Sequence, residues 1–153
     1  MKPLIFISMI MFCALSQAQL VASDAHVRAM PPGQPNTAAF LSLSNTSKQP
    51  VELVSATTSV AKKAEYHSHT KDDKGVMRMA KEESVKIKAG ETFQFKTGGY
   101  HIMLMGLNKT LTPGETVNIT LKDKLGNTYP FNLPVVSIMA EQNKQDHSHH
   151  HHH

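Results

Sequence analysis

The sequence predicts an all-β domain, built as a β-sandwich or small barrel, and three observations support this prediction. Short segments alternate apolar and polar residues, as strands with one buried face do. Turn-forming residues separate these segments about every eight to twelve residues, a spacing typical of sandwiches and barrels. No segment of ten residues or more shows helical periodicity. The 153-residue chain therefore reads as one domain, and no internal repeat is visible.

Nine segments are expected to form strands, each ended by a turn signal. In chain order they are residues 38–44, 51–57, 63–69, 76–80, 85–88, 92–96, 100–107, 117–122 and 129–136. The polar run 71–75, which contains Asp72 and Asp73, is expected to be a hairpin turn. Pro130 and Pro134 should place the last segment at a sheet edge, because proline lacks the N–H that a central strand donates.

Residues 1–18 are interpreted as a cleaved secretory signal peptide, which predicts a periplasmic protein. Lys2 is followed by an apolar run over residues 3–15 and then by small residues at the cleavage positions, ending at Ala18. The run is shorter than the about 20 residues that a membrane span needs, which argues against a membrane anchor. Once the signal peptide is removed, we expect no membrane span. Bulky residues precede Cys13 and argue against lipoprotein processing.

The composition of the mature chain excludes several classes of function. Cys13 is the only cysteine, so disulfides, thiolate metal sites, blue-copper centres and cysteine nucleophiles are excluded after cleavage. Without Lys2, 15 of the 16 Lys and Arg residues remain against 12 Asp and Glu, and this dispersed charge does not indicate nucleic-acid binding. No Gly-x-Ser-x-Gly motif is present, and Gln19, not histidine, would begin the mature chain. We therefore do not expect an enzyme.

The end of the chain, residues 139–153, is predicted to be a disordered His-rich tail that follows the folded domain 19–138. It is too polar to form a packed core. We interpret it as a native metal-binding segment, with an expression tag as the alternative. Since imidazole suits Cu(II), a tail Cu(II) site is predicted. Its ligands would be His147, His149, His150, His151, His152 and His153.

Methionine pairs and histidines stand close together in the middle of the chain. The pairs are Met77/Met79 and Met103/Met105, and His101 lies two residues before Met103. Because strand side chains alternate between faces, His101, Met103 and Met105 should share one face. A single Met-x-Met pair would more often be core filling.

Two further histidines, His67 and His69, precede the first methionine pair, which gives the order His, Met, His, Met along the chain. Imidazoles combined with thioethers form a neutral, soft donor set. Thioethers select Cu(I), whereas Zn(II) prefers thiolate, imidazole or carboxylate. The pattern therefore favours a Cu(I) site.

These residues resemble the signature of the PCu(A)C-type periplasmic copper chaperones. Met79 and His101 are separated by the 21 residues of that signature, and Met103 completes its His-x-Met. His67 and Met79 are separated by 11 residues, one more than the nominal spacing, which the hairpin turn can absorb. The stretches 27–33, 75–79 and 98–107 carry the resemblance further, over most of residues 25–122.

The resemblance implies a cupredoxin-like Greek-key β-barrel that binds Cu(I) at an exposed site and is a monomer. The implied ligands are His67, Met79, His101 and Met103, with Met77 and His69 in reserve and Met105 one layer deeper as an auxiliary residue. It also implies delivery of Cu(I) to a copper centre of cytochrome c oxidase, alongside a thiol-bearing copper chaperone. Periplasmic copper buffering or resistance is the alternative, and zinc scavenging by the tail is a weaker one.

Overall fold

The computed structural model describes residues 19–140, which form ten strands of one sheet. The strands are β1 (Leu20–Arg28), β2 (Asn36–Asn45), β3 (Val51–Thr58), β4 (Ala61–Lys71), β5 (Met77–Glu82), β6 (Val85–Ile87), β7 (Thr92–Phe95), β8 (His101–Leu107), β9 (Thr116–Asp123) and β10 (Thr128–Val136). The predicted signal peptide and the six tail histidines lie outside the described residues. No helix within residues 19–140 is long and apolar enough to cross a membrane.

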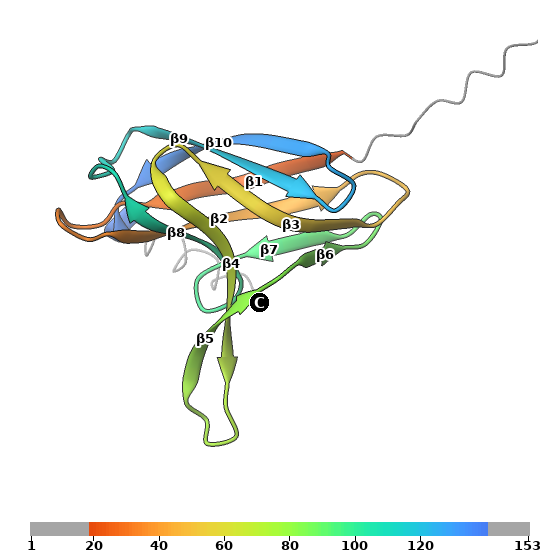
Figure 1. Ribbon diagram of the computed structural model, residues 1–153, viewed down its shortest axis with the longest axis horizontal. Helices are drawn as coiled ribbons and strands as arrows, with labels where there is room; N and C mark the ends of the chain where they lie inside the picture. The colour runs from red at the N-terminus through yellow and green to blue at the C-terminus, as the bar shows by residue number, and fades with distance from the viewer. Residues whose placement is uncertain (1–18, 141–153) are drawn as a thin grey trace, which may run out of the picture.

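Seven of these strands close into a barrel, in the order β4-β8-β2-β1-β10-β9-β3 (Figure 1). The pairing of Ala56 with Ala64 joins β3 to β4 and completes the ring. The β1–β10 pair is parallel, whereas the other barrel pairs are antiparallel. The remaining strands extend the sheet, with β5 on β4, β6 on β3, and β7 beside β8 along one edge of β2. The predicted all-β barrel is confirmed.

The core is formed by the inward faces of these strands. In β9 the side chains of Val117, Ile119 and Leu121 are at most 2% exposed, and the residues between them face outward. Burying each such side chain contributes about 1.5–3 kcal/mol relative to leaving it in water. The alternation that predicted strands is therefore the same pattern that fills the barrel.

Each of the nine predicted segments matches an observed strand to within two residues at either end, but β1 was not among them. A bulge between Ser23 and His26 explains the omission, since it shifts the register with β2. At this bulge Asp24 has a φ of 51°, in the left-handed region. The bulge changes which residues face inward partway along the strand, so Leu20 and Val27 are both buried although seven positions apart.

The predicted edge position of the last strand was wrong. β10 lies between β9 and β1. Its pairing with β1 involves only Val135 and Val136, which follow Pro130 and Pro134 in the chain. The missing N–H groups of the two prolines therefore do not interrupt the β1 ladder.

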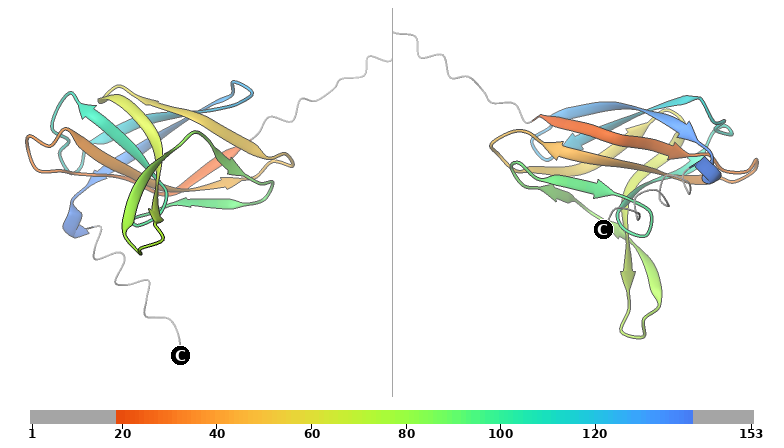
Figure 2. Two further views of the ribbon diagram at one scale, coloured as in Figure 1. Left: turned by 60° about the horizontal axis from the view of Figure 1, so that its bottom comes forward. Right: turned by 180° about the vertical axis from the view of Figure 1, so that it is seen from behind.

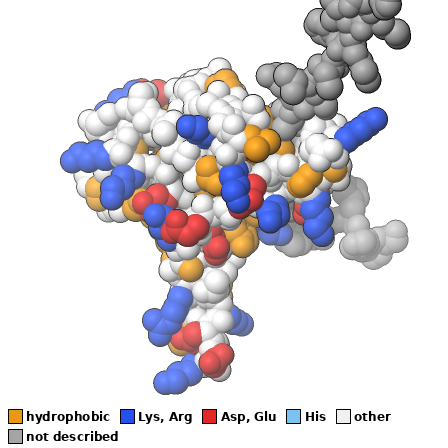
Figure 3. Space-filling model, turned by 45° about the vertical axis from the view of Figure 1, so that its right-hand side comes forward, with side chains coloured by type: hydrophobic (Ala, Val, Ile, Leu, Met, Phe, Trp, Pro, Cys, Tyr) orange, Lys and Arg blue, Asp and Glu red, His pale blue; other side chains and the backbone are white. Residues whose placement is uncertain are grey.

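The β4–β5 hairpin projects away from the barrel, as the views in Figure 1 and Figure 2 agree. Residues 71–75 form its turn, as predicted. The Asp72 carboxylate accepts hydrogen bonds from the backbone N–H of Lys74 and Val76, at 3.0 and 2.9 Å, and from Nε of Arg78 at 2.9 Å. The Arg78 bond is the main cause of a lowered Asp72 pKa. Charged side chains cover the outer end of the hairpin in Figure 3.

Candidate metal centre

The histidines and methionines of the middle of the chain lie on the outer face of three adjacent strands, β5, β4 and β8. Strand register places His67 opposite His101, and His69 opposite Met79. Met103 follows on the same face of β8, whereas Ile102 between them is buried in the core. Three strands thus bring donors from distant parts of the chain together.

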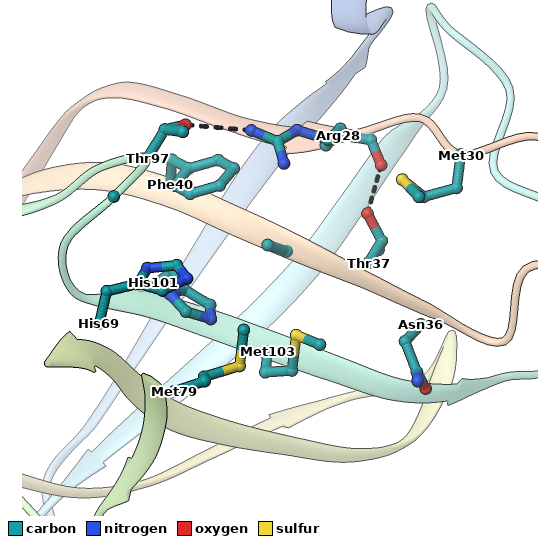
Figure 4. A pocket seen from close by; sticks show the side chains of 12 residues that line it. Arg28, Met30, Asn36, Thr37, Phe40, His69, Met79, Thr97, His101 and Met103 are labelled. Carbon is teal, nitrogen blue, oxygen red and sulfur yellow. Dashed lines mark hydrogen bonds between the residues drawn. The ribbon is translucent and has the colours of Figure 1, made fainter. Parts of the chain in front are cut away.

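A hollow of about 230 Å³ lies over this face. Figure 4 shows Met79 and Met103 side by side, with the imidazoles of His69 and His101 next to them. The hollow is lined by Arg28, Met30, Asn36, Thr37, Ala38, Phe40, His69, Met79, Thr97, Gly98, His101 and Met103. Three thioethers, those of Met30, Met79 and Met103, and two imidazoles therefore line one space that is open to solvent.

The loop between β7 and β8 fixes the ring of His101, which is 3% exposed. Its Nδ1 lies 3.3 Å from the carbonyl oxygen of Gly99, so Nδ1 carries the proton and donates, and Nε2 keeps its lone pair. The loop is closed by the Gly99 N–H, which donates to the Lys96 carbonyl at 3.0 Å, and Gly98 supplies a φ of 79°. Nε2 is therefore the nitrogen of His101 that can bind a metal.

Burial lowers the pKa of His101, and the nearby His69 and His67 lower it further, while the hydrogen bond to Gly99 opposes the shift. Only a neutral imidazole can bind a metal through Nε2 while Nδ1 holds a proton. The surroundings of His101 therefore favour the ligand-ready form.

In His67 the free ring nitrogen is Nδ1, whereas in His101 it is Nε2. Its Nε2 lies 3.2 Å from Oε2 of Glu65, and its ring centroid is 5.9 Å from that of His101. Its Nδ1 is buried and has no hydrogen-bond partner among residues 19–140. Glu65 also contacts Lys81 at 3.7 Å, and its pKa is lowered chiefly by the bond to His67. His67 lies beside the hollow and is not part of its lining.

His69, which the sequence gives as an alternative ligand, does line the hollow. Its ring centroid is 5.2 Å from that of His101, and its backbone N–H donates to Gly99 at 3.3 Å. Its Nδ1 is also buried without a partner in the described part of the chain. Strand β4 therefore offers two imidazoles to the site.

The second methionine of each Met-x-Met pair lies at the margin of the site. Met77 is 52% exposed, faces Lys71 across the hairpin, and does not line the hollow. Met105 was expected one layer deeper. It is instead partly exposed on the outer face, opposite Asn36 and Lys63, because an odd-numbered residue of β8 cannot reach the core.

Sequence reasoning missed the opposite wall of the hollow. The Arg28 guanidinium lies 4.9 Å from the Phe40 ring centroid and donates to Thr97 at 3.0 Å (Figure 4). The Phe40 ring is 6.4 Å from His101 and limits water access to one side of it. Met30 completes this wall. The stretch 27–33 marks Arg28 and Met30 in sequence, but Phe40 has the pattern of an ordinary core residue.

Within residues 19–140, no three His, Cys, Asp or Glu side chains form a group that could hold a metal ion. The donors that do meet are imidazoles and thioethers. Thioethers are soft ligands that suit Cu(I).

Known proteins resemble this chain in sequence and in fold. The family model "Putative lipoprotein LpqE-like" matches residues 20–135. A putative lipoprotein of Leifsonia xyli subsp. xyli is 39% identical over 114 residues, which cover 74% of this chain and 67% of that protein. The solution structure of Cu(I)-bound DR1885 from Deinococcus radiodurans is 38% identical, covers 80% of this chain and 83% of its own, and has a TM-score of 0.59. The copper-bound PCuAC domain from PmoF2 is 16% identical, covers 76% and 91%, and has a TM-score of 0.64.

Proposed function

The chain belongs to the LpqE-like family, and from this membership and the His/Met hollow we propose that it is a PCuAC-type copper-binding protein that carries Cu(I). One observation carries the proposal. A single hollow is lined by Met79 of β5 together with His101 and Met103 of β8. The Cu(I)-bound relative from Deinococcus radiodurans supports the same reading. We expect this chain to bind and transfer Cu(I) without catalysing a reaction.

We assign the Cu(I) ligands as Met79, Met103, Nε2 of His101 and Nδ1 of His67. Glu65 supports the choice of His67, because metal-binding histidines commonly donate their other ring N–H to a carboxylate. His69 is the alternative imidazole, since it lines the hollow. All four assigned ligands are neutral, which matches the low charge of Cu(I).

The exposure of the site suits transfer. Met79 is 48% exposed, so an incoming ligand can approach the metal from solvent on its side. A thioether is a weak ligand that a stronger donor such as a thiolate can displace. Stepwise exchange of this kind supports delivery to a copper centre of cytochrome c oxidase, directly or through a thiol-bearing copper chaperone. The putative lipoprotein family, the putative lipoprotein relative and the signal-peptide pattern of residues 1–18 support a periplasmic location.

A Cu(I) competition titration tests binding, with Met103→Leu as the variant and Met139→Leu as the matched control, because Met139 is 78% exposed and does not line the hollow. Met103→Leu should weaken Cu(I) binding by at least about tenfold, the lower bound for losing even an outer partner of a metal ligand. Equal Cu(I) affinity of both variants would refute the site.

Transfer is tested by mixing the Cu(I)-loaded protein with an apo CuA domain. Movement of copper to the CuA domain supports delivery. Retention of copper by this protein, at matched concentrations, would favour the alternative function of copper buffering or resistance.

A further inference from the structure

Strand β5 holds two thioethers that solvent can reach. Met77 is 52% exposed and Met79 is 48% exposed. They are two positions apart and therefore lie on the same face of β5. Met103 and Met105 of β8 are each only partly exposed. The hairpin thus presents one sulfur of the hollow, together with a second sulfur further out, to any small oxidant in solution.

We propose that Met77 and Met79 form an oxidant-sensitive pair, and that oxidation of Met79 to its sulfoxide by a peroxide closes the Cu(I) site. The proposal rests on the proposed function, because closure has meaning only if Met79 is a Cu(I) ligand. Met77 is about as exposed as Met79 and does not line the hollow, so oxidation of Met77 alone leaves the hollow intact.

The reaction needs only hydrogen peroxide as the oxidant. A sulfur lone pair attacks one peroxide oxygen, so that an S–O bond forms as the O–O bond breaks. The departing hydroxide then takes the proton from the oxygen on sulfur, which gives the sulfoxide and water. Sulfur loses two electrons and the peroxide gains them. The product replaces a soft, apolar thioether by a polar sulfoxide, and methionine sulfoxide reductases can reverse the change.

Two consequences follow from the lone pair that this reaction uses. A sulfoxide is a poor ligand for Cu(I), so an oxidised Met79 should release the metal. Conversely, a metal ion bound to Met79 occupies the same lone pair and should protect that sulfur. Met77 lies outside the hollow and should gain much less protection.

The first test measures the sulfoxide fraction at each methionine by peptide mass mapping after limited hydrogen peroxide treatment. The protein is treated alone and after loading with Ag(I), which is a soft monovalent ion like Cu(I) but does not cycle its oxidation state with peroxide. Without metal, Met77 and Met79 should oxidise faster than Met103. Ag(I) should slow oxidation of Met79 but not of Met139, the exposed control. Oxidation of Met79 at the slow rate of Met103, without metal, would overturn the proposal.

The second test uses the double variant Met77→Leu/Met139→Leu, in which Met79 is the most exposed sulfur left within residues 19–140. Peroxide treatment should lower its Cu(I) affinity by at least about tenfold, and sulfoxide reductase should restore it. Unchanged affinity in protein that carries the Met79 sulfoxide would overturn the proposal while leaving the Cu(I) site intact. Failure of the untreated protein to bind Ag(I) or Cu(I) would instead refute the proposed function.

Discussion

The imidazole of His67 reaches the metal face with one nitrogen already engaged, because its Nε2 lies 3.2 Å from Oε2 of Glu65. A carboxylate behind a metal-binding histidine fixes its tautomer and makes its free nitrogen a stronger donor. In His67 the free nitrogen is Nδ1, which is buried and lacks a partner among residues 19–140. Glu65 is therefore a positioning residue for the site and does not itself have to touch copper.

Replacing Glu65 should weaken Cu(I) binding without removing a ligand. We expect Glu65→Ala to lower Cu(I) affinity by about 10–100-fold, the range for loss of such outer partners. Glu65→Gln should cost less, since its amide oxygen can still accept the hydrogen bond. Glu83→Gln is the matched control, because Glu83 is 89% exposed and shares only the Lys81 contact. Affinities measured by chelator competition that are equal for Glu65→Ala and Glu83→Gln would contradict the assignment.

The two histidines of β4 should differ in their effect on the site. We expect His67→Gln to weaken Cu(I) binding more than His69→Gln, because Glu65 orients only His67. Long-range ¹⁵N–¹H NMR correlations should place the ring proton of His67 on Nε2 and that of His101 on Nδ1, before and after Cu(I) is added. A larger loss for His69→Gln would move the ligand to the imidazole that lines the hollow.

The methionine pair of β5 gives a sharper comparison. Met79→Leu should weaken Cu(I) binding by at least about tenfold, and Met77→Leu should have little effect. Met79 lines the hollow and Met77 does not. Both side chains are about half exposed, so neither variant should change the thermal midpoint appreciably, and each serves as the folding control of the other. A larger effect of Met77→Leu would mean that the spacing to His101 does not select the ligand.

The regular strands and the donor types could be predicted from sequence for the same reason. The strands and the donor types both depend on local patterns. Alternation along a strand fixes the face on which each side chain lies, so His101 and Met103 lie on the same face of β8. What failed depends on pairing between distant segments. The bulge at Asp24 hides β1. Strand β10 pairs along its length with β9, and only two residue pairs with β1 make it an interior strand.

The neighbours of the donors were hidden in the same way. Phe40 reads as a core residue in sequence, and only the β2–β8 pairing brings it near His101. The choice between His67 and His69 also depends on the register of β4 with β5 and β8, which a spacing that is one residue too long cannot fix.

The lowered pKa of His101 predicts how the metal-free protein responds to acid. Its ordinary value is 6.5, and burial lowers it in the folded state. As the pH falls below about 6.5, the unfolded chain takes up a proton that folded His101 resists, so the free energy of unfolding decreases until the pH passes the folded-state pKa. Above 6.5 this residue contributes no pH dependence.

Thermal midpoints measured across this pH range provide the test. His101→Gln should remove part of the acid-side decline. An equal decline in wild type and His101→Gln would contradict the burial argument.

The last prediction concerns the six tail histidines, which lie outside the described residues. Imidazole suits Cu(II), and Cu(II) has the highest affinity of the divalent first-row ions, whereas the thioether site of the barrel should prefer Cu(I). Truncation after Asp146 should therefore remove Cu(II) capacity and preserve Cu(I) affinity. Because imidazole must be neutral to bind, Cu(II) binding by the tail should fall as the pH drops through about 6.5, while the thioethers do not titrate. Separate titrations with each ion measure both effects, and an unchanged Cu(II) stoichiometry in the truncated protein would rule out a tail site.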